Sequence, residues 1–373
     1  MQFTAINFTC PSCGAPQKFS PVTGTLICEF CHKESTIDQL NIPIEEHQLN
    51  EALRKLDAEP NHTIEKQIHC KKCGGEFTLT PYTFSTNCPY CGTPAVTDFI
   101  KEITPQSLIP FRLSHKKAQE RFKAWVGSLW FAPSAFTKYL DGDNKLTGYY
   151  LPYWTYDSDT VTDYQGQRGD IYYVTVTKTV RDEQGRSRQI QVEESRIRWT
   201  PVRGTVSLSF DDITVGASKT VTRTILQALE PWDTKVLVPF DEKYLVGFEA
   251  EEYTVGLDNG FEYAKVKMQH SIETAIRRNI GGDQQQITST NTRYLHTTYK
   301  NILLPIWLAS FEWKGKTYRY AVNAQSGKVS GERPYSWLKI FFTITSVLLV
   351  GGMFFYLYTH PQILEYAGIH LRH

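Results

Sequence analysis

The sequence predicts a multidomain chain with two small zinc-ribbon β modules, a mixed α+β region and one C-terminal transmembrane helix. Three observations predict this order. All 8 cysteines of the 373-residue chain lie at or before Cys91, the middle alternates helix-like and strand-like patterns, and a long uncharged apolar run lies near the C-terminus. A chain of this length normally forms two or three domains. The expected divisions are a first ribbon at 1–36, a helical linker at 37–65, a second ribbon at 66–99, an α+β domain at 100–336, a transmembrane helix at 337–359 and a short exterior tail at 360–373.

The cysteines form four CxxC pairs, and the pairs repeat with one spacing. Fourteen residues separate Cys13 from Cys28, and fourteen separate Cys73 from Cys88. Two CxxC turns that face each other place four thiolates around one ion, which fills a tetrahedral shell and leaves no position for water. The spacing therefore predicts two structural metal sites. Their ligands are Cys10, Cys13, Cys28 and Cys31 in the first site and Cys70, Cys73, Cys88 and Cys91 in the second.

We expect two Zn²⁺ ions in these sites, since zinc needs no redox partner. Iron in a rubredoxin-like site is the alternative, because its four-sulfur ligand set is the same. Disulfides or redox CxxC pairs fit the duplicated spacing poorly. The N-terminal stretch MQFTAINFTC has neither a basic nor an apolar signal region, so we expect no secretory signal peptide and a reducing compartment.

Charge favours a protein contact over a nucleic-acid contact. The chain has 40 basic and 39 acidic residues, and neither cysteine module clusters Lys or Arg, as a phosphate-binding face normally does. A mean hydropathy of −0.36 excludes a polytopic transporter. The 13% of aromatic residues predicts β-rich cores.

The α+β region carries local signals for each of its elements. Apolar spacing predicts a helix before Pro60 and further helices that begin near Ser114 and Ser218 or end at Gly281. Alternating patterns predict two hairpins. The hairpins span Ile171–Trp199, with a turn at 182–185, and Ala309–Val322, with a turn at Lys314-Gly315.

A faint repeat occurs twice in this region. Residues 108–111 and 237–240 form an apolar-Pro-aromatic corner before a helix, and residues 151–154 and 304–307 form a Leu-Pro-x-Trp entry after it. We interpret this as two related halves, 100–235 and 236–336, with residues 155–235 inserted into the first. The alternative is that Pro-aromatic corners are simply common strand starts.

The C-terminal run Ile340–Tyr358 has 19 residues without a charge. As a helix it is about 28 Å long, close to the thickness of the hydrocarbon core of a bilayer. Lys328, Arg333 and Lys339 precede the run, so the positive-inside rule places the bulk of the chain in the cytoplasm. We therefore expect a single-pass protein of the inner, cytoplasmic membrane.

Catalytic motifs give no positive signal. Gly315-Lys316-Thr317 resembles the end of a phosphate loop, but Ser310 stands where that loop needs Gly. No Gly-x-Ser-x-Gly or HExxH pattern occurs, so we expect no catalytic residue, no small-molecule substrate and no enzyme activity.

Several runs resemble a family of bacterial TFIIB-type zinc-ribbon membrane proteins, and the resemblance covers nearly the whole chain. Members often carry automatic names such as primosomal protein N′ or helicase, and some are associated with phage-shock-type membrane-stress systems. The resemblance implies metal ligation by the four CxxC pairs and a phage-shock or ESCRT-III-like partner at the membrane. The runs are Tyr150–Asp157, Tyr164–Asp170, Glu230–Asp233, Ile280–Asp283, Val322–Gly327 and Gly331–Ser336.

Together these observations predict a non-enzymatic, zinc-binding adaptor or scaffold on the cytoplasmic face of the membrane. Its expected partners are the lipid bilayer and a protein. The alternative is a membrane-tethered zinc-ribbon protein that binds nucleic acid in replication, without the helicase motor.

Overall fold

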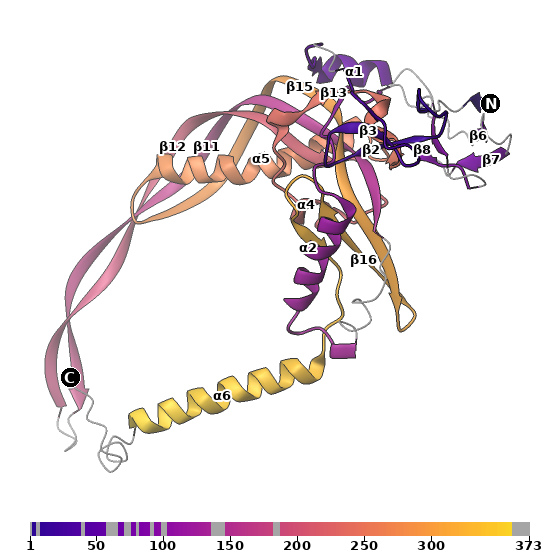
Figure 1. Cartoon of the computed structure of the whole chain (residues 1–373). Helices are drawn as coiled ribbons and strands as arrows, with labels where there is room; N and C mark the ends of the chain where they lie inside the picture. The colour runs from indigo at the N-terminus through magenta and orange to yellow at the C-terminus, as the bar shows by residue number, and fades with distance from the viewer. Residues whose placement is uncertain are drawn as a thin grey trace.

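The computed structural model shows a mixed α/β chain built around one large sheet (Figure 1). Two long strands form its centre, β11 (Thr147–Arg181) and β15 (Gln284–Trp313), which pair antiparallel. The described residues are 2–4, 8–38, 42–56, 66–70, 76–79, 82–89, 93–97, 103–135, 146–181 and 187–359.

Short strands extend the sheet on both sides of this central pair. The order along the sheet is β13 (Val238–Pro239), β10 (Ser107–Leu108), β15, β11, β14 (Glu249–Glu251), β8 (Thr83–Asn87) and β9 (Pro94–Val96). Four further strands pair beside this path: β12 (Ser187–Gly216) with β11, β16 (Lys316–Asn323) and β5 (His47–Gln48) with β15, and β17 (Val329–Gly331) with β16.

Aromatic side chains of β11 fill the core, as the composition predicts. Tyr150, Tyr153, Trp154 and Tyr156 are all fully buried. The indole N–H of Trp154 donates to a backbone carbonyl at 2.9 Å, and the hydroxyl of Tyr156 donates to another at 2.7 Å. The rings of Trp154 and Tyr156 are thus buried with their polar atoms hydrogen-bonded, which removes a cost that would otherwise oppose burial.

Helix α5 (Leu257–Ile280) covers one face of the sheet beside β11 and β12. Gly281, with φ of +67°, follows its last residue and confirms the predicted helix end. Gly260 has no side chain, which lets the rings of Trp154 and Tyr156 lie directly against the helix. The buried residues repeat every three or four positions, as expected for one core-facing stripe: Leu257, Gly260, Ala264, Met268, Ile272, Ile276 and Ile280.

Two strand–helix–strand units have the same pairing pattern. Strand β10 leads to α2 (His115–Gly127) and then β11, and β14 leads to α5 and then β15. Each short strand pairs in parallel with the long strand of the other unit, and Leu151 lies opposite Leu304 between the two Leu-Pro-x-Trp segments. By this pairing pattern, β14 is the counterpart of β10. The sequence repeat had instead suggested the segment at 237–240. The duplication itself stays a prediction.

Other predicted elements in the described residues agree with the structure except for one helix start, while the predicted turn at 182–185 lies outside the described residues. Ser114 accepts from the Lys117 N–H at the start of α2, and Lys314 and Gly315 form the turn of the β15–β16 hairpin. The short helix α4 (Arg223–Ala228) begins at Thr222 and not at Ser218. The Ser218 hydroxyl instead donates to the Glu251 carboxylate at 2.9 Å and accepts from the Thr220 N–H at 3.0 Å, so it closes a turn before the helix.

The N-terminal region forms two small sheets. One contains β2 (Gln17–Ser20), β3 (Thr25–Cys28) and β4 (Glu34–Ser35), and the other contains β1 (Gln2–Thr4), β6 (Lys66–His69) and β7 (Glu76–Leu79). Helix α1 (Leu49–Leu56) lies in the predicted linker, but its Leu49 is buried in the same cluster as Trp154 and Tyr299. This part of the linker is therefore packed on the main sheet.

Helix α6 (Trp337–Thr359) follows the sheet at the C-terminal end and projects away from it (Figure 1). The stretch Trp337–Tyr356 has a mean hydropathy of 1.9, and none of it is buried. By length and composition it can cross a membrane. The predicted exterior tail at 360–373 lies outside the described residues.

The stripe on α5 predicts unequal effects of two truncations on one helix. Ile272→Ala removes a fully buried side chain and should lower the free energy of unfolding by about 2–5 kcal/mol. Val266→Ala, at a side chain that is 72% exposed, should change it by less than about 0.5 kcal/mol. Denaturant unfolding of both full-length variants in detergent checks this. Equal effects would show that α5 does not pack through this stripe.

Candidate metal centre

Two CxxC turns hold the first cysteine set. The backbone N–H of Cys10 donates to the Ala15 carbonyl at 2.7 Å, and that of Cys28 donates to the Lys33 carbonyl at 3.0 Å. Each bond closes a tight turn that directs the two sulfurs of its pair to one side. The residue after each second cysteine is left-handed, with φ of +71° at Gly14 and +55° at His32.

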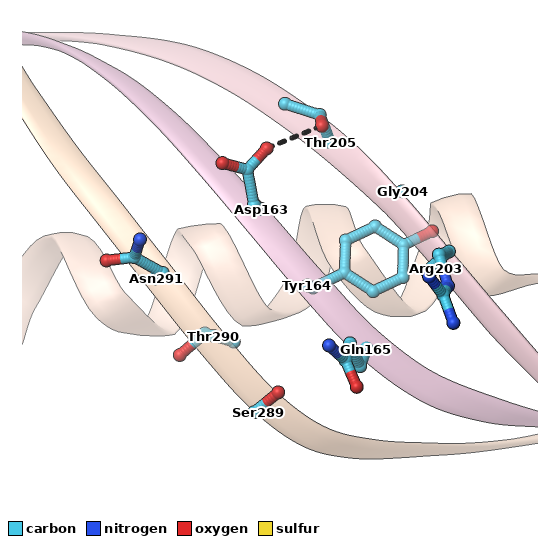
Figure 2. A pocket seen from close by; sticks show the side chains of 9 residues that line it. All are labelled: Asp163, Tyr164, Gln165, Arg203, Gly204, Thr205, Ser289, Thr290 and Asn291. Atoms are coloured by element: carbon cyan, nitrogen blue, oxygen red, sulfur yellow. Dashed lines mark hydrogen bonds between the residues drawn. The ribbon is translucent and has the colours of Figure 1, made fainter.

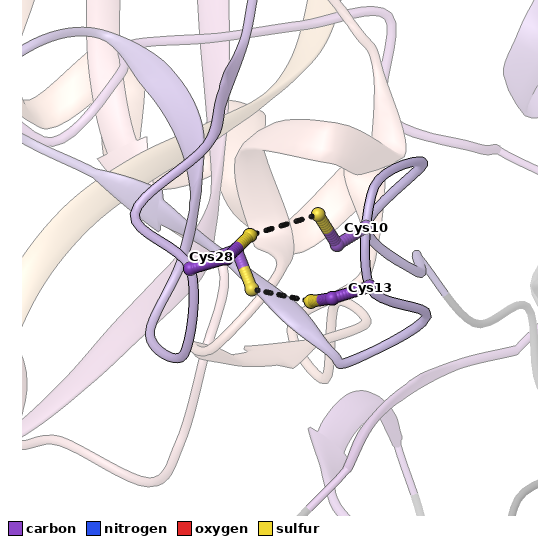
Figure 3. A group of neighbouring side chains, drawn as sticks. Cys10, Cys13 and Cys28 are labelled. Carbon is purple, nitrogen blue, oxygen red and sulfur yellow. Dashed lines mark hydrogen bonds between the residues drawn. The ribbon is translucent and has the colours of Figure 1, made fainter.

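The four sulfurs of Cys10, Cys13, Cys28 and Cys31 lie within 4.8 Å of one another. Figure 3 labels three of these residues, Cys10, Cys13 and Cys28. Two sulfur–sulfur distances, Cys10 to Cys31 and Cys13 to Cys28, are 3.5 Å, far longer than a disulfide bond. Tetrahedral coordination with Zn–S bonds of about 2.3 Å requires sulfurs about 3.8 Å apart. The cluster therefore has the size and ligand chemistry that a Zn²⁺ or Fe ion needs.

Hydrogen bonds make the four thiols unequal. Burial opposes ionisation of Cys10, but backbone N–H groups of its own turn lower its pKa to about 6. The backbone N–H of Cys31 is the main cause that lowers the pKa of Cys28. A backbone N–H also acts on Cys13, yet the sulfurs of Cys28 and Cys31 raise the pKa of that thiol to about 12. A bound cation would remove the repulsion between neighbouring thiolates, because it favours the thiolate form of all four ligands.

The second predicted set is described only in part. Cys70 follows β6, Cys88 follows β8, and both are buried. The Cys88 N–H donates to the Thr93 carbonyl at 2.8 Å, which repeats the turn geometry of the first set. Cys73 and Cys91 lie outside the described residues. One four-cysteine cluster that could hold a metal is therefore shown, and the second stays a prediction.

The first cysteine module packs onto the large sheet and its helices, which we call the body. Phe19 of β2 is buried against Tyr244 and Phe248, with ring centroids 5.3 and 6.3 Å apart. Its backbone N–H donates to the Val246 carbonyl at 2.9 Å. Leu26 of β3 belongs to the same core cluster. Metal binding would thus hold in place a hairpin that completes the core of the body.

The second module meets the same part of the body. Strand β8 pairs with β14, and the Ser85 hydroxyl donates to the Phe248 carbonyl at 2.9 Å. Phe84 is fully buried in the cluster that contains Phe19. Both modules therefore converge on the platform at 244–251, a contact that spacing alone does not predict.

A second group of titratable side chains lies within the sheet, away from the cysteines. Lys300 is mostly buried, and its ammonium lies 2.8 Å from Asp212, 3.0 Å from Glu46 and 3.8 Å from Asp157. Asp157 and Asp212 also belong to a carboxylate group with Asp211. The lysine neutralises part of this charge. Sequence reasoning missed this cluster because its members come from four distant segments.

The environment of Asp157 shifts its ionisation. Burial raises the pKa of its carboxyl to about 6, although the Asp212 N–H and the Lys300 ammonium oppose the shift. The same ammonium lowers the pKa of Glu46 despite the burial of that carboxyl. The cluster fastens the segment before α1 to β15, because Glu46 binds both Lys300 and Thr298.

Figure 2 shows a shallow polar depression across β15, β11 and β12, with a helix behind the strands. Tyr164 points to the helix side, where its hydroxyl donates to Asn279 of α5 at 2.5 Å. On the strands themselves, Asp163 accepts from Thr205 at 2.7 Å and from Arg293 at 3.4 Å. This carboxylate is therefore already engaged by its neighbours.

Comparison with known proteins identifies a relative of similar length. The chain is 28% identical over 349 residues to YdjG, an uncharacterised protein of Bacillus subtilis strain 168, and the match covers 90% of this chain and 92% of that protein. No family model matches the chain, and no solved structure matches it.

Replacing one sulfur should empty the first site and loosen its hairpin. Cys28→Ser should remove one metal ion per chain and lower the free energy of unfolding by about 3–6 kcal/mol, because Phe19 and Leu26 lose their fixed positions in the core. Metal analysis and denaturant unfolding of the purified full chain measure both effects. Ser12→Ala, at an exposed side chain of the same module, is the control and should change neither. A Cys28→Ser chain with unchanged metal content would refute the assignment.

The raised pKa of Asp157 predicts a pH effect of definite sign. The folded chain holds a proton at this carboxyl more tightly than the unfolded chain, whose ordinary value is 3.8. Its contribution to stability is therefore present below pH 4 and is lost as pH rises to about 6. Asp157→Asn removes this loss, so the stability of the variant relative to the unmodified chain should rise from pH 4 to 6.

Thermal unfolding of the two chains over this pH range provides the measurement. Asp163→Asn, on the same strand with a carboxylate side chain that is 51% exposed, is the matched control. A stability difference for Asp157→Asn that stays flat or falls with pH would contradict the assigned shift.

Proposed function

We propose that this chain is a non-catalytic, zinc-stabilised adaptor held at the cytoplasmic membrane, and that a protein partner docks on a projecting β arm. The arm comprises residues 170–181 of β11 and 187–198 of β12. The observation that carries the proposal is a row of exposed and half-buried apolar side chains along this arm, far from the core of the sheet.

The arm begins where β15 ends. The last pair between β11 and β15 is Gly169 with Gln284, and beyond it β11 pairs only with β12. From Asp170 to Arg181 the ribbon can extend about 40 Å, and Figure 1 shows it curving away from the body beyond α5. A two-stranded ribbon without a third layer is only marginally stable in water, so a partner on its face would stabilise it.

One face of the arm carries a row of apolar side chains that is interrupted by charged ones. Cross-strand register places the even-numbered residues of both strands on the same face, with Val176 opposite Val192 at the centre. The other face carries Thr, Gln and Ser at most positions, and also the exposed Ile171, Tyr173 and Ile197 near the base of the arm. The apolar residues of the even-numbered face are Tyr172, Val174, Val176, Val180, Ile190 and Val192. An exposed apolar stripe rimmed by polar residues is typical of a protein-interaction surface.

Charge on the apolar face favours an acidic partner. Four basic residues, Lys178, Arg188, Arg196 and Arg198, and two acidic ones, Asp170 and Glu194, lie on this face, so its net charge is positive. Lys178 pairs with Glu194 at 2.7 Å, and the guanidinium of Arg198 lies 5.1 Å from the ring centre of Tyr172. The remaining basic groups would attract a partner with acidic flanks.

Membrane attachment follows from α6 in this proposal. Its apolar stretch carries no buried residue, and Lys328, Arg333 and Lys339 at its N-terminal side support a cytoplasmic body. The resemblance to TFIIB-type zinc-ribbon membrane proteins supports a phage-shock or ESCRT-III-like partner. The cysteine modules would then serve as structural supports that complete the body from which the arm projects.

Site-specific photocrosslinking in intact membranes tests the arm. A photoreactive phenylalanine analogue at Val176 should yield an adduct with a protein partner, and the same analogue at Thr177, the next residue on the opposite face, is the matched control. Both variants keep the full chain and its membrane segment. We expect a protease-sensitive adduct from position 176 that is at least several-fold stronger than from position 177.

Three other outcomes would overturn this assignment. An adduct that nucleases remove would favour the nucleic-acid alternative. An adduct of twice the chain mass would make the arm a contact between copies of the chain. Equal or absent adducts from both positions would show that the apolar face receives no partner.

A further inference from the structure

The loop that follows α2 lies on the first turn of α6. The Ser336 N–H donates to the Phe131 carbonyl at 2.7 Å. The ammonium of Lys339 donates to the carbonyls of Trp130 at 3.1 Å and Ala132 at 2.8 Å. Two segments about 200 positions apart are therefore joined where the apolar helix begins.

The backbone of this loop is fixed, while one large side chain points out. Leu129 and Ala132 are 3% and 1% exposed and belong to the core cluster that also contains α2. Trp130, between them, is 74% exposed. Burying an indole in the core would stabilise the protein, so a rigidly held and exposed Trp indicates a surface that something else covers.

Further aromatic rings gather at the same end of α6. Trp337 in the first turn is 82% exposed, and Tyr335 just before it is 56% exposed. Trp and Tyr rings concentrate at the headgroup level of a bilayer, where their apolar body and polar edge are both satisfied. Trp130 thus lies in the zone where α6 would enter the membrane.

Charge at this position fits a lipid surface. Lys339 has three ammonium protons, of which two are used by the loop carbonyls, so a third can reach a phosphate. Arg333 lies 5.5 Å from the ring centre of Tyr335. The acidic neighbour Glu332 accepts from the Arg319 N–H at 3.3 Å. The helix itself contains no Asp or Glu.

We propose that Trp130 is a second membrane contact, with its indole at the headgroup level of the leaflet in which α6 begins. Lys339 is the positioning residue that ties the loop to the helix. This inference rests on the proposed membrane attachment and adds that the body meets the bilayer at two points. Two contacts fix how the body, and with it the arm, is oriented over the membrane.

Fluorescence quenching by brominated lipids tests the contact with the full chain in vesicles of phosphatidylcholine and phosphatidylglycerol. The chain has 8 tryptophans, so the contribution of Trp130 is the difference between the unmodified chain and Trp130→Phe. This contribution should be quenched at least twofold more by bromine near the headgroup than by bromine at the end of the acyl chain. Trp199→Phe, at a half-buried residue of β12, gives the control difference, which should not depend on bromine.

Lys339→Met tests whether Lys339 positions the loop that carries Trp130. It leaves Trp130 and the apolar helix in place but removes the link between them, so quenching of Trp130 by shallow bromine should fall. A Trp130 contribution that is insensitive to bromine, or unchanged by Lys339→Met, would overturn the respective part of the inference.

Alkaline carbonate extraction of the same vesicles distinguishes a missing Trp130 contact from a missing membrane attachment through α6. A chain that stays in the membrane while Trp130 is unquenched contradicts only the second contact. A chain released by carbonate contradicts the membrane attachment itself.

Discussion

The crowding of four sulfurs within 4.8 Å is the constraint on which the N-terminal part of the structure depends. Four thiolates at this separation repel one another, and a bound cation turns that repulsion into attraction. The three-stranded sheet β2–β3–β4 is too small to bury a core of its own. Its inner residues Phe19 and Leu26 instead complete the core of the body. A metal ion bound by these sulfurs would therefore hold the hairpin in the position where it closes the core.

The packed sheet also connects the two ends of the molecule. Both cysteine modules meet the platform at 244–251, and β14 of that platform pairs with β11. Strand β11 in turn continues from the centre of the sheet into the arm. At the other end of the sheet, the loop after α2 holds the first turn of α6. A partner on the arm would thus be connected to the membrane through one packed sheet.

Local signals in the sequence predicted much of this arrangement. The periodicity of α5, the hairpin turn at Lys314-Gly315 and the four-cysteine cluster all depend on residues close in sequence or on a fixed spacing. The sheet order and the Glu46–Lys300 ion pair were not predictable in this way, because these partners lie 254 positions apart. Ser218 shows the opposite case, because the residue that the local pattern assigned to a helix cap instead forms a turn, with hydrogen bonds to Thr220 and to the distant Glu251.

X-ray absorption at the metal edge of the purified full chain tests the central claim most directly. The account predicts a metal whose first shell consists of four sulfurs at about 2.3 Å, the distance expected for a closed tetrahedral zinc site. A protein purified without metal, or a metal with nitrogen or oxygen in place of these sulfurs, would contradict it.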